Sequence, residues 1–522
     1  MEKNKSGQMD FIYLLIIVGL IASYVLLRYG ELWAVGGDSS RFTFSIHAML
    51  SERGLVPGKN IYPNGYGYQT IAVFLINVTG ITLRTLQLYG ATLLAMWMVF
   101  PAWFLYRELT GTREGGMLAT IILFVQPELL FGILRGTHEK FTRGLMLLAL
   151  YLLVRSLQSR NSPARFTSFV LAFYITSYAL VSFNNLHTTS FTWAMGLSIL
   201  LTWVVMRAKW ASFELTKPAI RRLAFASVIL LGFAFLFTFY VYEPAKRNLL
   251  FVQSTGNQVA NLFLEIEKER SNPYSVVTTG WINVPTYFTV SLANWLLLVG
   301  SMLSWLFQTI GLLLRRWRPK TKGELLLWVL YGGFALISGL SIAIDVSGEA
   351  GGNIQHRIFP TFAMLGAPMI AKSLVELLPR QGTRRRFAVT TLGVSLALLA
   401  VLSIFKATND PLLSNRWQFY ELSEIRALDW AQDTLTDRAI WSGFDERLFS
   451  AFTIHHGASI SQVTIDKFEV NPNTQDFLIS DVIRRRSVRL SAPLPIEADS
   501  FITYDNGPVQ IYHWRPHTIY QE

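Results

Sequence analysis

Residues 387–405 read FAVTTLGVSLALLAVLSIF, and this run lies between Arg384-Arg385-Arg386 and Lys406. It carries no charged side chain, and at a helical rise of about 1.5 Å per residue it spans a hydrocarbon core of about 30 Å. Comparable apolar runs recur along most of the chain before it. The pattern predicts a mainly α-helical, polytopic membrane protein with about 11 transmembrane helices.

The expected spans share this apolar composition and have polar or basic flanks. They are residues 11–28, 85–106, 115–134, 141–155, 166–183, 188–206, 223–242, 287–313, 324–344, 357–378 and 387–405. No small-residue cleavage pattern follows the first run, so we interpret it as an uncleaved span and not as a signal peptide.

The overall composition agrees with a membrane protein. Of the 522 residues, 51% are hydrophobic and only 15% are charged, which is too apolar for a soluble domain of this size. The net charge of +12 lies mainly between the spans, so it indicates membrane topology and argues against a nucleic acid partner. The chain contains no cysteine, which excludes disulfides, thiolate nucleophiles and thiolate metal ligands.

The basic residues between the spans predict the orientation of the protein. With a cytoplasmic N-terminus, every inside connection is basic, from Arg107 and Arg113 to the cluster Arg384-Arg385-Arg386. The apolar segment 66–81 must then stay on one side, because a crossing there would move all later basic clusters outside. We interpret this segment as a juxtamembrane or re-entrant helix.

This topology divides the chain into two domains. Residues 1–406 form a transmembrane domain, with long outer loops at 29–84 and 243–286. Residues 407–522 lose the membrane-length apolar runs, so they are expected to form a small soluble α/β domain on the non-cytoplasmic side.

The soluble domain shows the usual signals of helix and strand. An amphipathic helix is expected at 421–435, and short strands are expected at 439–443 and 462–465. A hairpin is expected at 501–514, turning at Asp505-Asn506-Gly507.

The first outer loop contains the more informative of two outer acidic positions. Asp38 follows two glycines and begins an amphipathic segment from Phe42 to Leu50, whose apolar face is expected to lie along the membrane surface. An ordinary helix N-cap explains Asp38 equally well, because its carboxylate accepts free amide hydrogens. Farther along, Tyr62-Pro63 begins an aromatic turn that leads into the segment 66–81.

The second acidic position is Glu139, in the short outer sequence Arg135-Gly136-Thr137-His138-Glu139-Lys140. Glu139 precedes a long apolar helix, where a carboxylate also compensates the helix dipole. Ionisable groups near the hydrocarbon core are costly unless they are solvated, paired or functional. On the predicted topology, Asp38 and Glu139 lie at the same face of the membrane.

These elements together resemble the GT-C glycosyltransferases. The resemblance rests on Asp38 in the first outer loop, the aromatic-Pro element Tyr62-Pro63, Glu139 after a later span, and the cytoplasmic turn 106–111. His356-Arg357, followed by Pro360, resembles the late-helix Arg-and-Pro element, and the segment 504–512 resembles the closing hairpin of the soluble domain. The chain lacks the Trp-Trp-Asp signature of oligosaccharyltransferases, which leaves the donor sugar and acceptor open.

The resemblance implies an integral membrane enzyme that moves a sugar from a polyprenyl-phosphate carrier to a lipid, glycan or protein acceptor, with inversion. Such a transfer needs a base for the acceptor and a cation for the leaving phosphate. The expected catalytic residues are Asp38, as general base or acceptor-orienting group, and Glu139. The expected substrate-binding residues are Arg41, Tyr62, His138, His356 and Arg357, with the guanidinium of Arg357 neutralising the phosphate.

The sequence leaves open whether the site contains a divalent metal ion. Its candidate ligands are Asp38, Glu139 and His138, and His187 and His356 also fall at predicted outer loops or helix ends. The spacing matches no compact metal motif, so hydrogen bonding is the other interpretation of these histidines.

Two further functions remain open on the sequence. One is a protein- or oligosaccharide-transferase of the same superfamily, which differs in its acceptor and donor. The other is a non-enzymatic transporter of envelope polysaccharide, for which internal repeats and charges near the bilayer midplane are typical. This chain shows no apparent repeat and concentrates its acids at one face.

Overall fold

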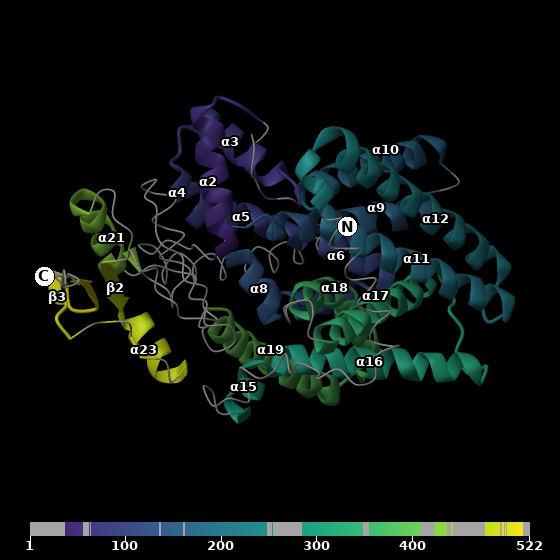
Figure 1. The fold of residues 1–522 in the computed structure, drawn as a ribbon. Coiled ribbons are helices and arrows are strands. Elements are labelled where there is room, and N and C mark those ends of the chain that lie inside the picture. The colour runs from purple at the N-terminus through teal and green to yellow at the C-terminus, as the bar shows by residue number, and fades with distance from the viewer. Residues whose placement is uncertain are drawn as a thin grey trace, which may run out of the picture.

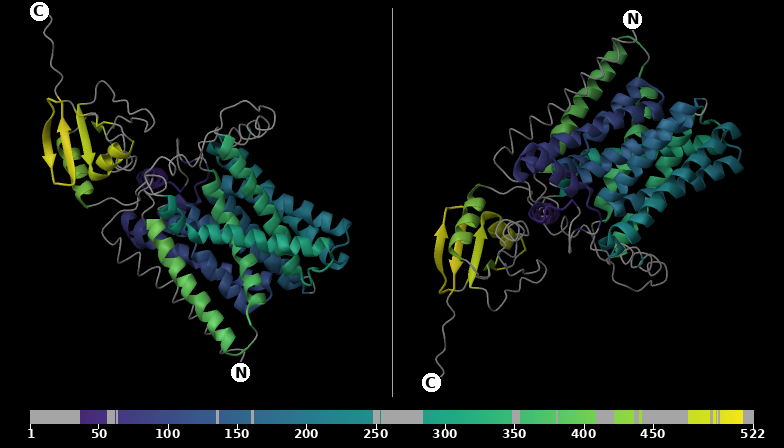
Figure 2. Two further views of the ribbon diagram at one scale, coloured as in Figure 1. Left: turned by 90° about the horizontal axis from the view of Figure 1, so that it is seen from below. Right: turned by 90° about the horizontal axis from the view of Figure 1, so that it is seen from above.

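In the computed structural model, the described residues are 37–55, 62, 64–134, 137–159, 162–247, 253, 284–347, 354–379, 381–408, 422–435, 440–441, 475–490, 493–494, 496 and 498–514. They form a bundle of long helices with a small α/β unit at one end (Figure 1). Two further views show the strands of this unit standing apart from the bundle, on the side of the first described helix, α2 (Gly37–Ser51) (Figure 2).

Eight helices in the described part are long and apolar enough to cross a membrane. They are α9 (Glu139–Gln158), α10 (Pro163–Phe183), α11 (Asn185–Arg207), α12 (Phe213–Leu236) with its π-helical extension η3 (Phe237–Val241), α16 (Leu292–Leu313), α17 (Lys322–Ser347), α18 (Ile354–Leu377) and α19 (Thr383–Thr408). The prediction of a mainly helical, polytopic membrane protein is therefore confirmed. The expected first span, 11–28, lies outside the described residues.

The expected span 115–134 is not one straight helix. It consists of α7 (Arg113–Phe124) and α8 (Pro127–Leu134), which are bent by 70° relative to each other. Pro127 explains the break, because it has no N–H to donate and its ring disfavours a helical conformation of the preceding residue. The bend leaves α8 free to contact α5, α9, α16, α18 and α19.

The expected span 85–106 lies within a segmented helical run. Its parts are α4 (Leu83–Thr85), the π-helical turn η1 (Leu86–Gly90), α5 (Ala91–Ala95), the 3-10 turn η2 (Met96–Met98) and α6 (Val99–Thr110). The residues at the junctions keep right-handed helical dihedrals, so the chain continues in one direction while the hydrogen-bond spacing changes. Two short elements, η4 (Glu243–Lys246) and α15 (Val284–Val290), lie at the two ends of the segment 243–286.

The segment 66–81 forms the short helix α3 (Gly67–Thr79). Its 13 residues extend about 20 Å, less than the core of a bilayer, in agreement with a helix that does not cross. The apolar face of α2 packs on α3: Phe42, Ile46 and Met49 are fully buried in one cluster with residues of α3. The expectation that this face lies along the membrane surface is therefore wrong, because the protein itself covers it.

The C-terminal unit is a small α/β fold. Its elements are α21 (Leu422–Thr434), β1 (Ile440–Trp441), β2 (Asp476–Ser480), α23 (Asp481–Leu490), β3 (Phe501–Asp505) and β4 (Val509–His513). The strand order is β1-β2-β4-β3, with β1 and β2 parallel and the other neighbours antiparallel. The expected helix, first strand and closing hairpin are confirmed, and the expected strand at 462–465 lies outside the described residues.

Strand β2 and helix α23 were not predicted. All five residues of β2 are buried, since β2 is a central strand, so the sequence there shows no alternation of polar and apolar side chains. The predicted turn is built as expected: the N–H of Gly507 donates to Oδ1 of Asp505 at 2.7 Å, and Gly507 has a φ of 86°.

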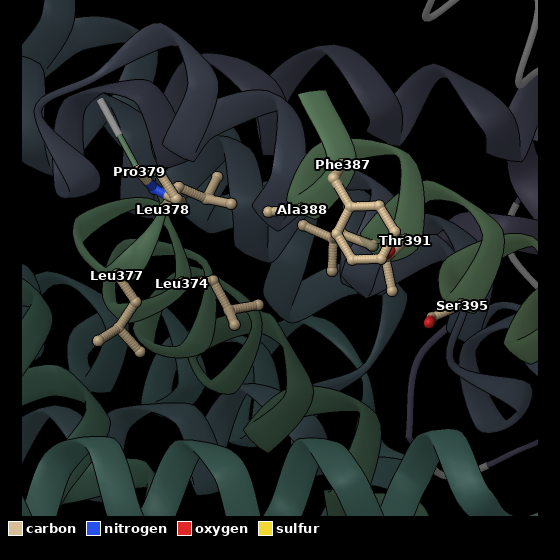
Figure 3. Close-up of a pocket in the computed structure, with 9 residues that line it drawn as sticks. Leu374, Leu377, Leu378, Pro379, Phe387, Ala388, Thr391 and Ser395 are labelled. Atoms are coloured by element: carbon tan, nitrogen blue, oxygen red, sulfur yellow. The ribbon is translucent and has the colours of Figure 1, made fainter. Parts of the chain in front are cut away.

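The largest apolar core lies among the membrane helices α6, α7, α9, α11, α17 and α18. Beyond it, an apolar groove of about 410 Å³ separates the end of α18 from the start of α19 (Figure 3). The groove is lined by Leu374, Leu377, Leu378, Pro379, Phe387, Ala388, Thr391, Leu392 and Ser395. Since Leu374 is 17 residues beyond Arg357, the groove lies about 25 Å along α18 from that arginine and is not part of the site described below.

Candidate active site

Two long helices, α9 and α11, are joined by a hydrogen bond between the residues that precede them. Asn184 caps α11, since its Oδ1 accepts the N–H of His187 at 2.9 Å. The same side chain donates from Nδ2 to Nε2 of His138, which occupies the N-cap position of α9. Both side chains are buried. One asparagine therefore fixes the starts of α9 and α11 relative to each other.

Glu139, the first residue of α9, meets basic groups from two helices. Its Oε2 lies 3.3 Å from Nη2 of Arg143, one turn along α9, and its Oε1 lies 4.0 Å from Nε2 of His187 on α11. The three side chains are between 5% and 13% exposed, so water screens their charges weakly. These contacts restrict the orientation of the carboxylate.

The guanidinium of Arg143 rests on Gly132 of α8. A Cβ at position 132 would overlap Nη1 of Arg143, so only glycine leaves room for the guanidinium in this position. The bent helix α8 therefore contacts Arg143, the partner of Glu139.

Three aromatic rings connect α2 to the start of α9. The ring of Phe42 lies 4.7 Å from that of Tyr62 and 4.9 Å from that of His138, and the Tyr62 and His138 rings are 5.0 Å apart. Asp38 lies one helical turn before Phe42 on α2, a rise of about 6 Å. The second turn of α2, through Phe42, is thus in contact with the start of α9.

The loop that carries Tyr62 is fastened to α10 and α11. The N–H of Asn185 donates to the carbonyl of Asn64 at 2.6 Å, and the N–H of Tyr66 donates to the carbonyl of Ser182 at 2.9 Å. Between them, Gly65 has a φ of 152°, and a Cβ there would overlap the carbonyl of Ser182. The loop therefore requires glycine at this position.

A tyrosine that directly follows α12 and η3 closes the same loop. The Tyr242 hydroxyl donates to the carbonyl of Tyr62 at 2.9 Å, and Asn64 Nδ2 donates to the Tyr62 hydroxyl at 2.9 Å. Burial raises the pKa of the Tyr242 phenol well above its ordinary value, so the phenol stays a neutral donor. These bonds hold Tyr62 beside His138.

The structure brings some of the predicted site residues together. Tyr62, His138 and Glu139 are in one neighbourhood, and the backbone of Asp38 and Arg41 in α2 lies next to it. His356 and Arg357 fall in the first turn of α18, a helix that contacts α8. The side chains of Asp38, Arg41, His356 and Arg357 are outside the described part, and their roles stay predictions.

Arg143, Gly132 and Lys140 also belong to this neighbourhood and were not predicted. The spacing of Glu139 and Arg143, four residues apart on one helix, was a usable sign of a pair. No local sign linked Gly132 to Arg143, because their contact depends on the bend at Pro127.

The described side chains do not by themselves complete a metal site. Among them, no group of three His, Asp or Glu side chains is placed to hold an ion. Glu139 and His187 offer one oxygen and one nitrogen, 4.0 Å apart, whereas Nε2 of His138 is engaged by Asn184. His187 is therefore better placed than His138 to share an ion with Glu139.

Comparisons with known proteins give no match in sequence but several in structure. No protein-family model matches the chain, and neither does any curated protein. The oligosaccharyltransferase of Archaeoglobus fulgidus aligns with 97% of this chain and 75% of its own, with 12% identity and a TM-score of 0.57. ArnT from Cupriavidus metallidurans, solved with undecaprenyl phosphate, aligns with 96% of this chain and 97% of its own, with 12% identity and a TM-score of 0.52. This chain has the GT-C fold.

Other structures of the archaeal GT-C protein were solved with ligands. One contains an inhibitory peptide and a dolichol-phosphate, and aligns with 97% of this chain and 74% of its own at 11% identity and a TM-score of 0.55. The archaeal protein was also solved with Zn and sulfate. The GT-C fold of this chain confirms the architecture that the sequence predicted, with membrane helices followed by a small α/β unit.

Proposed function

We propose that this chain is an integral membrane glycosyltransferase. It moves a sugar from a polyprenyl-phosphate carrier to a lipid, glycan or protein acceptor at the non-cytoplasmic face. The observation that supports this most directly is the contact between two helices near their starts: Glu139, held by Arg143 and His187, begins α9, and His138 before it contacts Phe42, one turn after Asp38 on α2. The GT-C fold supplies the second argument.

The proposed reaction is a single displacement with inversion. The oxygen or nitrogen of the acceptor bonds to the anomeric carbon, and Asp38 accepts the proton that this acceptor atom loses. At the same time the bond from the anomeric carbon to the phosphate oxygen breaks. Glu139 orients the acceptor, and the guanidinium of Arg357 takes up the negative charge of the departing phosphate. No sugar becomes attached to the protein in this scheme.

The proposal includes a divalent metal ion as a possible component of the site. The residues that would hold it are Glu139 and His187, with Asp38 as the third ligand, and Arg41, Tyr62 and His138 remain in the roles of substrate contacts. A bound ion would supply positive charge beside the phosphate oxygens. Addition of a chelator, followed by a titration of Mn²⁺, Mg²⁺ or Zn²⁺, tests this component separately from the transfer itself.

The proposed orientation places the site and the C-terminal unit outside the cytoplasm. It is supported by the basic residues at the opposite ends of the helices and by the position of α2 at the end that faces the C-terminal sheet (Figure 2). Carrier lipid and acceptor would then meet where Asp38 and Glu139 lie.

A protein- or oligosaccharide-directed transferase is the second candidate. One observation favours it: the archaeal oligosaccharyltransferase, which shares the fold of this chain, was also solved with a tethered acceptor peptide. The two candidates differ in the acceptor, so acceptor peptides and glycolipid fractions supplied side by side separate them.

The transfer is tested with the purified protein and labelled polyprenyl-phosphate sugars. The unaltered protein is expected to label an envelope fraction, and Asp38→Asn is expected to reduce the rate about 100-fold or more while leaving the Tm unchanged. Asp433→Asn, at an exposed aspartate of α21, is the matched control and is expected to keep full activity. Absence of labelling with every donor contradicts the proposal, and movement of glycan across vesicles without a new glycosidic bond establishes the transporter alternative.

A further inference from the structure

Lys140 is a fully buried lysine at the start of α9. It is 0% exposed, and its Nζ has no hydrogen-bond partner among the described residues. The two other buried lysines of the described part are paired: Lys372 lies 3.2 Å from Glu324, and Lys406 forms an ion pair with Glu128. Lys140 therefore differs from both, since no described residue supplies a counter-charge to it.

The neighbouring carboxylate does not fill this role. Glu139 precedes Lys140 directly, but its two oxygens are directed at Arg143 and His187. An ammonium group removed from water without a counter-charge is strongly unfavourable, whereas a bound anion restores the lost interaction. The first amides of α9 add to the positive potential at the same place.

The helix geometry places Lys140 between two packed surfaces. Arg143 lies on the side of α9 that meets Gly132 of α8. Gly144, one turn beyond Lys140, packs on Trp97 of η2, since a Cβ added at Gly144 would lie 2.8 Å from the Trp97 ring. At about 100° per residue, Lys140 falls between these two directions. Its stem therefore enters the junction of α8, η2 and α9.

A second buried donor lacks an acceptor at the same helix start. The hydroxyl of Thr137, a residue that is 1% exposed, has no hydrogen-bond partner among the described residues. Buried polar atoms are normally hydrogen-bonded, so two such donors three residues apart leave the start of α9 short of acceptors among the described residues. An oxyanion supplies several acceptor lone pairs at once.

We infer that Lys140 and Thr137, with the first amides of α9, form a phosphate-binding subsite. The inference rests on the proposed function, and it assigns to this subsite the phosphate group of the donor carrier or the phosphate that remains after transfer. Lys140 is then a binding residue for the leaving group.

The test is thermal stabilisation of the purified, full-length protein by defined probes. The probes are undecaprenyl phosphate, neutral undecaprenol and inorganic phosphate. Undecaprenyl phosphate is expected to raise the Tm of the unaltered protein, and undecaprenol is not. In Lys140→Met the apparent affinity for undecaprenyl phosphate is expected to fall at least tenfold. Lys140→Arg is expected to keep a larger part of the rise in Tm.

A matched control and a second variant separate binding from stability. Lys372→Met removes a buried lysine that is paired, so it is expected to lower the Tm but to keep the full shift with undecaprenyl phosphate. Without any probe, Lys140→Met is expected to be at least as stable as the unaltered protein, because it removes an unpaired charge. Thr137→Val, which keeps the shape of the side chain, is expected to weaken phosphate binding several-fold.

The outcomes distinguish the two proposals. If Lys140→Met and Thr137→Val bind undecaprenyl phosphate as tightly as the unaltered protein does, the subsite is wrong and the proposed function stands. If the unaltered protein responds to no phosphate probe, both fail. Equal stabilisation by inorganic phosphate and by undecaprenyl phosphate, lost in Lys140→Met, supports the subsite and identifies free phosphate as its ligand.

Discussion

Both carboxylate oxygens of Glu139 lie near basic side chains, Arg143 of α9 and His187 of α11. The position of Arg143 depends on a glycine in a third helix, α8. Arg143 approaches to 3.3 Å only because position 132 on α8 is a glycine. His187 approaches to 4.0 Å because Asn184 caps the helix that carries it. The position of this carboxylate is therefore set by neighbours on α8, α9 and α11.

Gly132→Ala tests the support of Arg143. The new methyl group overlaps the flexible end of Arg143, so the guanidinium moves while the backbone stays, and the turnover is expected to fall about 10- to 100-fold with little change in Tm. The control is Gly196→Ala in α11, where a Cβ meets nothing within 4 Å and full activity is expected. Equal activity of the two variants would show that the position of Arg143 is unimportant.

Glu139→Gln tests the charge of the carboxylate. The amide keeps the shape but removes the charge that faces Arg143 and His187, and we expect the kcat to fall about 100-fold. Glu108→Gln is matched to it, since Glu108 also pairs with an arginine, Arg155, at 2.9 Å. A comparable loss of kcat in both variants would indicate that the effect comes from a broken ion pair and not from the site.

Among the elements, α8 connects most parts of the candidate site. The 70° bend at Pro127 turns it across the bundle, where it contacts α9, α18 and α19. At its start, Glu128 forms a buried ion pair with Lys406 of α19 and accepts a hydrogen bond from Nδ2 of Asn294 at 3.3 Å. The helix that supports Arg143 is thus tied to the helix that leads into the C-terminal unit.

Lys406→Met measures the strength of this connection. It leaves Glu128 as a buried, uncompensated carboxylate, so a loss of about 3–5 kcal/mol in the free energy of unfolding is expected. The double variant Glu128→Gln with Lys406→Met is expected to recover much of it. Arg385→Met, which breaks the more exposed pair with Glu114, is the control and should cost at most about 1 kcal/mol. Chemical denaturation in detergent gives all of these values.

Gly65→Ala tests the loop that presents Tyr62. The substitution combines a φ of 152° with an overlap on the carbonyl of Ser182, so a marked fall in Tm is expected. Gly80→Ala also introduces a side chain at positive φ, 71°, but into open space, and it should cost only about 1 kcal/mol. If the two variants melt at the same temperature, the contact between the loop and α10 contributes little to stability.

At the scale of the whole molecule, the C-terminal sheet and the site belong to one end of the bundle. The figures place α2 and α3 on the side of the sheet, and Tyr89 of η1 packs against the core of the C-terminal unit (Figures 1 and 2). At the other end of the bundle, Glu108 pairs with Arg155 and Glu324 pairs with Lys372.

The absence of cysteine allows a direct test of orientation. A single cysteine at exposed Thr434 of α21 is expected to react with a membrane-impermeant thiol reagent applied to intact cells, and one at exposed Gln381 is not. Both should react after permeabilisation. The reverse pattern would place the candidate site on the cytoplasmic face and contradict the proposed orientation.

The sequence predicted the features that depend on short stretches of chain. The length and polarity of the apolar runs predicted the membrane helices, and turn residues predicted the hairpin at Asp505-Asn506-Gly507. The helix starts at Asp38 and Glu139 followed from polar residues placed before apolar periods. These properties are local, since helix formation and turn geometry depend on neighbours within a few residues.

The partners of these elements were decided only by the tertiary structure. Arg143 meets Gly132 because Pro127 bends α8, and Glu128 meets Lys406 across 278 positions of sequence. The apolar face of α2 is covered by α3, although its pattern fits a membrane surface equally well. An apolar or charged side chain specifies the kind of surface it needs but not which distant segment provides it, because burial and charge pairing are satisfied by any complementary partner that the fold brings near.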